Sequence, residues 1–142
     1  MLKKVLISGL VSLTLATGLS ANNYDLKTNM SMLSATLSGV EQGFLTNDKK
    51  ATLEALDRFQ NEIDTLLGDK ENITKLLPEK LKHKASMATN TATMIDKYIG
   101  EIREILTDES MPMIDRENKS QKAYLNIEGQ CFRCHNMVRD WE

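Results

Sequence analysis

Two cysteines and a histidine near the end of the chain form the group of residues best suited to chemistry. The segment Cys131-Phe132-Arg133-Cys134-His135 has the spacing C-x-x-C-H, which is the attachment signature of c-type haem. Two thiols at this spacing can add to the two vinyl groups of one porphyrin, and the residue that follows then lies beneath the iron. We therefore expect Cys131 and Cys134 to hold one haem c per chain, with His135 as a ligand of the iron.

Three other interpretations of these residues remain open. Cys131 and Cys134 could form a structural disulfide, although it would close only a very small loop. A thioredoxin-like dithiol belongs in a βαβ context, and the chain shows no strand pattern. A zinc site needs four ligands, and beyond the motif only His83 and acidic residues could supply the fourth. The export signal and the helical character of the chain favour haem.

Residues 1–21 have the pattern of a secretory signal peptide. Lys3 and Lys4 precede an uncharged apolar stretch, and small residues between Ala16 and Ala21 provide a cleavage site. The apolar run is short for a membrane span, and no stop-transfer charges follow it. We expect residues 22–142 to be exported to the periplasm as one domain. The remaining apolar segments are amphipathic, so no membrane span is predicted for the mature form.

The amino-acid composition argues against a β-sandwich fold and against nucleic acid as a partner. Aromatic residues make up 5% of the 142 residues, which is low for a β-sandwich. Only two prolines interrupt the chain, so long helices can form. The formal net charge of -2 provides no basic surface for binding nucleic acid.

Apolar residues recur every three or four positions along most of the chain, which indicates amphipathic helices. The expected helices cover residues 24–45, 48–67, 78–107 and 112–140. The polar segment 69–77 is expected to be a loop, with a helical turn within it as an alternative. Gly68 fits a left-handed helix stop, and Pro78 fits the first turn of the third helix. The fold class is therefore predicted to be all-α, as an antiparallel up-down four-helix bundle.

A C-x-x-C-H motif on the last helix of such a bundle resembles the class II c-type cytochromes, the cytochrome c-prime family. The first helix adds a second resemblance. Its segment Asp25-Leu26-Lys27-Thr28-Asn29-Met30-Ser31-Met32-Leu33, continuing to Leu37 and Glu41, is similar to the opening helix of the soluble haem-b four-helix cytochrome. Both resemblances are local. Between the two matched segments, the chain resembles these cytochromes only in its predicted architecture.

The resemblance implies that Met30 and His135 bind opposite faces of the haem iron. Met30 also lies on the apolar stripe of its helix, with Leu33 and Leu37 as neighbours that could wall the cofactor. Met32, or an open position on the iron, remains an alternative. Arg139 matches an arginine of the haem-b relative and could pair with a haem propionate.

The function expected from these residues is a periplasmic c-type cytochrome that carries single electrons, with other periplasmic redox proteins as partners. The alternative is a five-coordinate cytochrome c-prime-like protein that binds small gases such as NO or CO. A haem-containing structural or sensory module is a third candidate. We do not expect an enzyme, because haem catalysis needs an open position and distal polar groups. The resemblance also makes a second copy of the chain a candidate partner.

Overall fold

The structure is a computed structural model that describes residues 25–138. These residues form helices and connecting turns, with no strand among them, so the predicted all-α class is confirmed. The elements are α1 (Leu26–Leu45), α2 (Lys49–Leu67), α3 (Lys70–Leu76), the 3-10 helix η1 (Glu79–Lys84), α4 (Ala85–Thr107) and α5 (Met113–Val138). The predicted signal peptide at 1–21 and the predicted propionate partner Arg139 lie outside the described residues.

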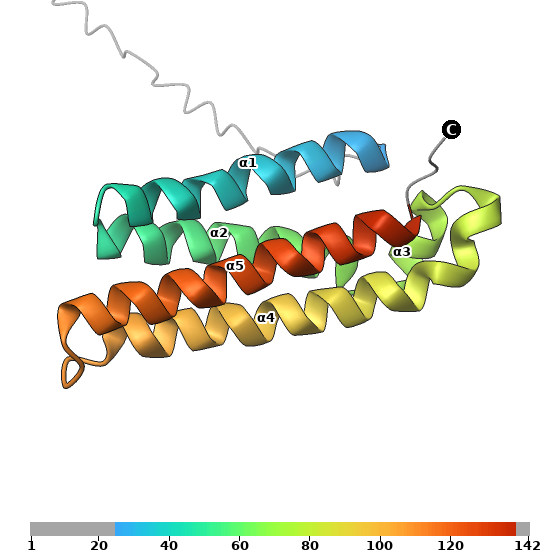
Figure 1. Cartoon of the computed structure of the whole chain (residues 1–142). Coiled ribbons are helices and arrows are strands. Elements are labelled where there is room, and N and C mark those ends of the chain that lie inside the picture. Colours follow the sequence, from blue (N-terminus) through green and yellow to red (C-terminus); the bar gives the residue numbers. More distant parts are fainter. Residues whose placement is uncertain (1–24, 139–142) are drawn as a thin grey trace, which may run out of the picture.

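The four long helices lie side by side in two pairs (Figure 1). α1 packs mainly on α2, α4 packs mainly on α5, and contacts between α2 and α4 join the pairs. The beginning of α1 and the end of α5 lie at the same end of the molecule, next to α3 (Figure 1). This arrangement brings two segments from opposite ends of the chain close together.

Aspartates begin three of the helices by accepting hydrogen bonds from otherwise unpaired backbone N–H groups. Asp25 accepts from the N–H of Thr28 at 2.8 Å, and Asp48 accepts from the N–H of Ala51 at 2.9 Å. Asp69 caps α3 through the N–H of Glu71 at 3.0 Å. The chain turns between α1 and α2 at Thr46-Asn47-Asp48, where Asn47 has a φ of 52°.

The segment between α2 and α4 differs from the prediction. Residues 69–77 contain more than the helical turn that the sequence allowed, because α3 occupies the seven residues Lys70–Leu76. The expected third helix does not begin as an α-helix at Pro78, since residues 79–84 form η1. Burial explains the difference: Ile73, Leu77 and Leu81 recur every fourth residue and are all buried, so this segment covers one end of the core.

The prediction of a left-handed helix stop at Gly68 is wrong. Its φ of -68° lies in the right-handed region, so it is not a left-handed stop. The cap residue Asp69 follows at once and begins α3, so the chain needs only a bend between the two helices.

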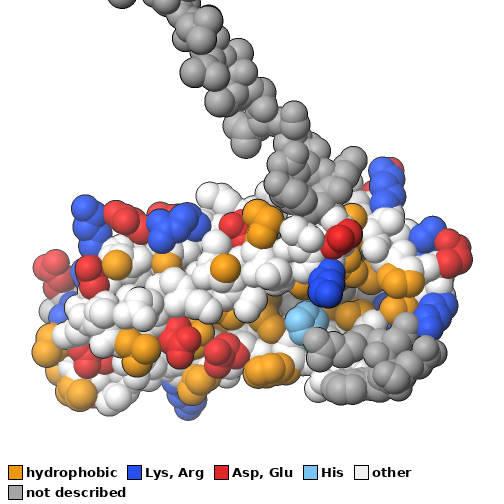
Figure 2. Space-filling model, turned by 90° about the horizontal axis from the view of Figure 1, so that it is seen from above, with side chains coloured by type: hydrophobic (Ala, Val, Ile, Leu, Met, Phe, Trp, Pro, Cys, Tyr) orange, Lys and Arg blue, Asp and Glu red, His pale blue; other side chains and the backbone are white. Residues whose placement is uncertain are grey.

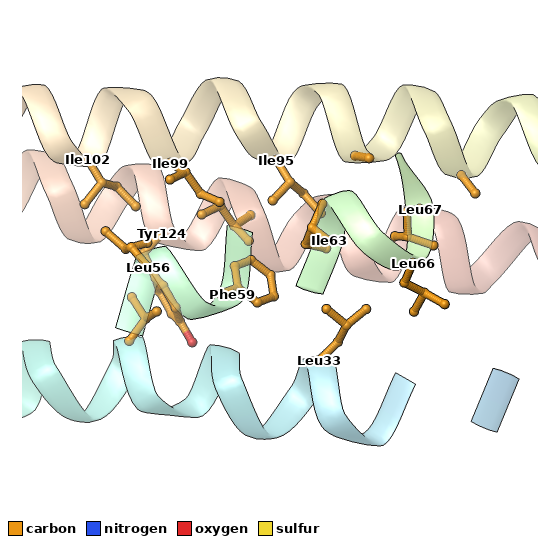
Figure 3. Packing of buried hydrophobic residues seen from close by; sticks show 14 of the residues in the cluster. Leu33, Leu56, Phe59, Ile63, Leu66, Leu67, Ile95, Ile99, Ile102 and Tyr124 are labelled. Carbon is orange, nitrogen blue, oxygen red and sulfur yellow. The ribbon is translucent and has the colours of Figure 1, made fainter. Parts of the chain in front are cut away.

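The core lies between the helix pairs along most of their length. Ile95, Ile99 and Ile102 of α4 point toward Phe59 and Ile63 of α2 (Figure 3). Each of these side chains is at most 1% exposed, and burying one contributes roughly 1.5–3 kcal/mol relative to leaving it in water. Leu33 reaches the same cluster from α1 (Figure 3).

Close contact between α1 and α2 depends on Gly43. A Cβ atom at this position would lie 2.8 Å from the Cα and from the backbone nitrogen of Thr52. Contacts under 3 Å are not tolerated without a shift of one helix. Glycine at this position therefore fixes how closely α1 approaches its partner.

None of the helices within residues 25–138 combines the length and the apolar character that crossing a bilayer requires.

Candidate functional site

A cavity of about 320 Å³ lies between α1 and α5 and reaches down to α2 and α4. Its lining is mostly apolar. The lining residues are Met30, Leu33, Ser34 and Leu37 of α1, Phe59, Ile63 and Leu67 of α2, Thr91 and Ile95 of α4, and Glu128, Cys131, Phe132, Cys134 and His135 of α5. Seen from above the view of Figure 1, hydrophobic side chains reach the surface beside a histidine (Figure 2).

Cys131 and Cys134 both line this cavity as free thiols. They lie one turn apart on α5, so both can face the same side of the helix. Cys134 is buried and Cys131 is half-buried. The structural disulfide considered from the sequence is therefore not formed.

Burial keeps both thiols protonated at neutral pH. Burial, followed by the electrostatic effects of Cys134 and Glu128, raises the pKa of Cys131 to about 11. Burial also raises the pKa of Cys134, and a hydrogen bond from Thr91 opposes this effect. The cavity thus presents two neutral sulfur groups on an apolar wall.

His135 follows Cys134 directly and lines the same cavity, with its side chain half-buried. The end of its helix is held by Lys84, whose ammonium group donates a hydrogen bond to the backbone oxygen of Met137. Since the last carbonyls of a helix lack partners within the helix, this contact helps to fix the end of α5. Lys84 belongs to no motif that the sequence analysis identified.

Met30 reaches the cavity from α1, across from the motif on α5. Its side chain is half-buried and packs against the core. Met32 is 44% exposed and does not line the cavity. Met87 and Met94 line a separate groove between α4 and α5. Among the described methionines, the cavity lining therefore includes Met30 alone.

Leu33 is 8% exposed and lines the cavity one turn after Met30. Phe59, Ile63 and Ile95 extend the same apolar wall and belong to the core cluster. Leu33, which the sequence predicts as a wall residue, therefore lines the cavity. The deeper part of the wall consists of side chains from α2 and α4.

Glu128 is the lining residue that sequence reasoning missed most clearly. It lies seven residues before His135 and three before Cys131, which places all three on one side of α5. That spacing is a signal that could have identified it. Phe132 occupies one of the two x positions of the C-x-x-C-H motif, and it lines the cavity while remaining 66% exposed.

Residues 25–138 do not contain the arrangement of side chains that a zinc site needs, nor the fold that a thioredoxin-like dithiol needs. No group of three or more His, Cys, Asp or Glu side chains gathers there to hold a metal ion. The βαβ unit of a thioredoxin-like dithiol is likewise absent from these residues.

Comparisons with protein-family models, with curated proteins and with solved structures found no match for this chain. Function must therefore be argued from the cavity and the side chains that line it.

Proposed function

We propose that the protein is a periplasmic one-electron carrier with one haem c in the cavity between α1 and α5. Cys131 and Cys134 attach the porphyrin, His135 binds the iron from α5, and Met30 binds it from α1. One observation carries this proposal: all four side chains line a single cavity. The motif alone predicts attachment, whereas the position of Met30 supports a second iron ligand.

We further propose that the four long helices form an antiparallel up-down bundle. In that arrangement the beginning of the first helix lies level with the end of the last. The presence of Met30 and His135 in one cavity supports it.

The side chains present fit the chemistry of a haem. The cavity volume of about 320 Å³ falls within the range of pockets that hold cofactors. Its walls combine apolar side chains, which would contact the porphyrin, with an imidazole and a thioether, which are both known ligands of haem iron. The two thiols occupy the same cavity as this pair.

Each side chain has a defined role in this function. Cys131 and Cys134 would hold the porphyrin through two thioether bonds, each formed by adding the S–H of a cysteine across a vinyl group with no atom lost. His135 supplies a ring nitrogen, and Met30 supplies a sulfur that favours the ferrous state. Leu33, Phe59 and Ile63 exclude water, which reduces the reorganisation of solvent when the charge changes. When bound, the haem supplies an iron that cycles between Fe(III) and Fe(II).

No bond of a substrate is made or broken in this proposal, so the protein is a carrier and not an enzyme. Its partners are other redox proteins of the periplasm. From the signal-peptide pattern of residues 1–21, we infer that the protein is exported.

The absorption spectrum of the ferric protein, matured in a host that attaches c-type haem, tests the ligand set. We expect a low-spin spectrum with the weak charge-transfer band of methionine bound to iron(III). A high-spin spectrum, together with carbon monoxide binding after reduction, would instead identify the five-coordinate gas-binding protein.

A further inference from the structure

A second groove, of about 380 Å³, lies between α4 and α5, which run side by side (Figure 1). Its lining includes the basic side chains of His83, Lys84 and Arg133, and none of the described residues that line it is acidic. We call it the basic groove. The whole chain has a formal net charge of -2, so this gathering of basic side chains does not reflect the average composition of the protein.

Within residues 25–138, neither Lys84 nor Arg133 forms an ion pair with an acidic side chain. Lys82, in the same segment, differs because it pairs with Glu79 at 2.6 Å. The Lys84 ammonium group donates one hydrogen bond to the backbone oxygen of Met137, and two further N–H groups on it can donate to an anion. Arg133 is exposed, and its planar guanidinium group can bind both oxygens of a carboxylate.

The other side chains of the basic groove suit an acidic peptide segment. Ser86, Asn90 and Gln130 supply hydroxyl and amide groups that can donate hydrogen bonds. Met87 and Met94 are half-buried and add an apolar, adaptable surface. The methylene groups of an aspartate or glutamate side chain can pack on these thioethers while its carboxylate reaches the basic side chains.

The basic groove also shares a wall with the cavity of the C-x-x-C-H motif. Thr91 lines both of them and is 6% exposed. Its side chain forms a hydrogen bond with the thiol of Cys134. Arg133 directly precedes Cys134 in the chain. A partner bound in the basic groove would therefore lie next to the residues that attach the cofactor in the proposed function.

We propose that the basic groove docks an acidic surface segment of a redox protein, with Lys84 and Arg133 pairing with its carboxylates. The inference rests on the proposed function, since that function makes the partner a redox protein. Charge complementarity speeds the encounter of two proteins and fixes their orientation more than it raises their affinity. An electron carrier needs fast binding and fast release, so a docking surface of this kind suits it.

The test is an NMR titration of the isotope-labelled mature protein with a polyglutamate peptide as the probe. We expect the amide signals of residues 83–94 and 130–133 to shift, and the affinity to fall as ionic strength rises from about 10 mM to about 150 mM. Arg133→Gln should weaken binding by about two- to fivefold, and Arg133→Lys, which keeps the charge, should weaken it less. Lys49→Gln is the matched control and should bind as the parent does, because Lys49 is exposed and begins α2 at the other end of the molecule (Figure 1).

A second measurement connects docking to electron transfer. The reduced, haem-loaded protein is oxidised by ferricyanide, an anion, and by tris(phenanthroline)cobalt(III), a cation. Arg133→Gln should slow the reaction with the anion and leave the reaction with the cation as fast or faster. Equal slowing of both reactions would indicate damage to the cofactor site and would overturn the docking role of Arg133.

Three results of the titration would also overturn the inference. They are signal shifts outside the basic groove, an affinity unchanged in Arg133→Gln, and binding of citrate as tight as that of the peptide, which would indicate a site for small anions. The titration does not need the cofactor, so the two proposals can fail separately. A protein that binds the peptide in the basic groove without covalent haem would overturn the carrier function alone.

Discussion

Met30 on α1 and His135 on α5 line the same cavity, although they lie near opposite ends of the chain. The residues between them fold so that the beginning of α1 and the end of α5 lie at one end of the molecule (Figure 1). This relationship distinguishes Met30 from Met32, which is two positions away and exposed. The proposed haem would therefore take its two protein ligands from different helices.

Replacing Met30 should open one side of the iron. We expect Met30→Ala, loaded with haem, to change the ferric spectrum from low-spin to high-spin and to bind carbon monoxide after reduction. The reason is that alanine offers no sulfur, and no other described methionine lines the cavity. Met32→Ala is the matched control and should keep the parent spectrum, since Met32 does not line the cavity. A low-spin, unreactive Met30→Ala protein would show that the ligand assignment is wrong.

The haem-free protein should lose stability at alkaline pH. The pKa of Cys131 in the folded chain is about 11, above its ordinary value of 9.0, because burial disfavours the thiolate. A group whose pKa is raised by folding contributes stability below its unfolded pKa, and this contribution is lost as pH rises through the folded pKa. The free energy of unfolding in urea should therefore fall between about pH 9 and pH 11.

The control variant for this measurement is Cys131→Ser, because a serine hydroxyl does not titrate between about pH 9 and pH 11. It should show a smaller loss of unfolding free energy between the same pH values. The remaining loss is expected from Cys134 and Tyr124, whose pKa values are also raised by burial. An equal loss in the parent and in Cys131→Ser would contradict the burial of this thiol.

A pair of glycine variants tests the close packing of α1 on α2. Gly43→Ala places a Cβ atom 2.8 Å from the backbone of Thr52, and overpacking of this kind lowers the free energy of unfolding by about 1–3 kcal/mol. Gly100→Ala adds a Cβ atom in α4 with no neighbouring atom within 4 Å. It should raise the free energy of unfolding by roughly 0.5–1 kcal/mol, because alanine is the better helix former. Thermal unfolding of the two variants in parallel provides the comparison, and equal effects would exclude the close approach at Gly43.

Much of the fold follows from periodicity that can be read in the sequence. The stripe that contains Leu56, Phe59 and Ile63 predicts a helix whose buried face is the one found. The full length of α3 does not follow from the sequence, because four of the six residues that separate Ile73, Leu77 and Leu81 are polar. Their burial depends on tertiary contacts with α4, which a local pattern does not reveal.

The sequence predicts the residues that would attach the cofactor, but it predicts only part of the cavity wall around them. Cys131, Cys134 and His135 follow from a short motif, and Met30 follows from its helix stripe and the resemblance. Glu128 and the α2 wall were not predicted, because side chains from other helices decide which positions face a cavity. The site roles of Arg139 and the cleavage of residues 1–21 stay predictions, since both lie outside the described residues.

The intact mass of the denatured protein, after export in a host that matures c-type cytochromes, tests the central claim most directly. The account predicts the mass of the mature chain plus one haem, with no such addition in the Cys131→Ser/Cys134→Ser double variant. A colourless protein with the mass of the polypeptide alone would contradict it.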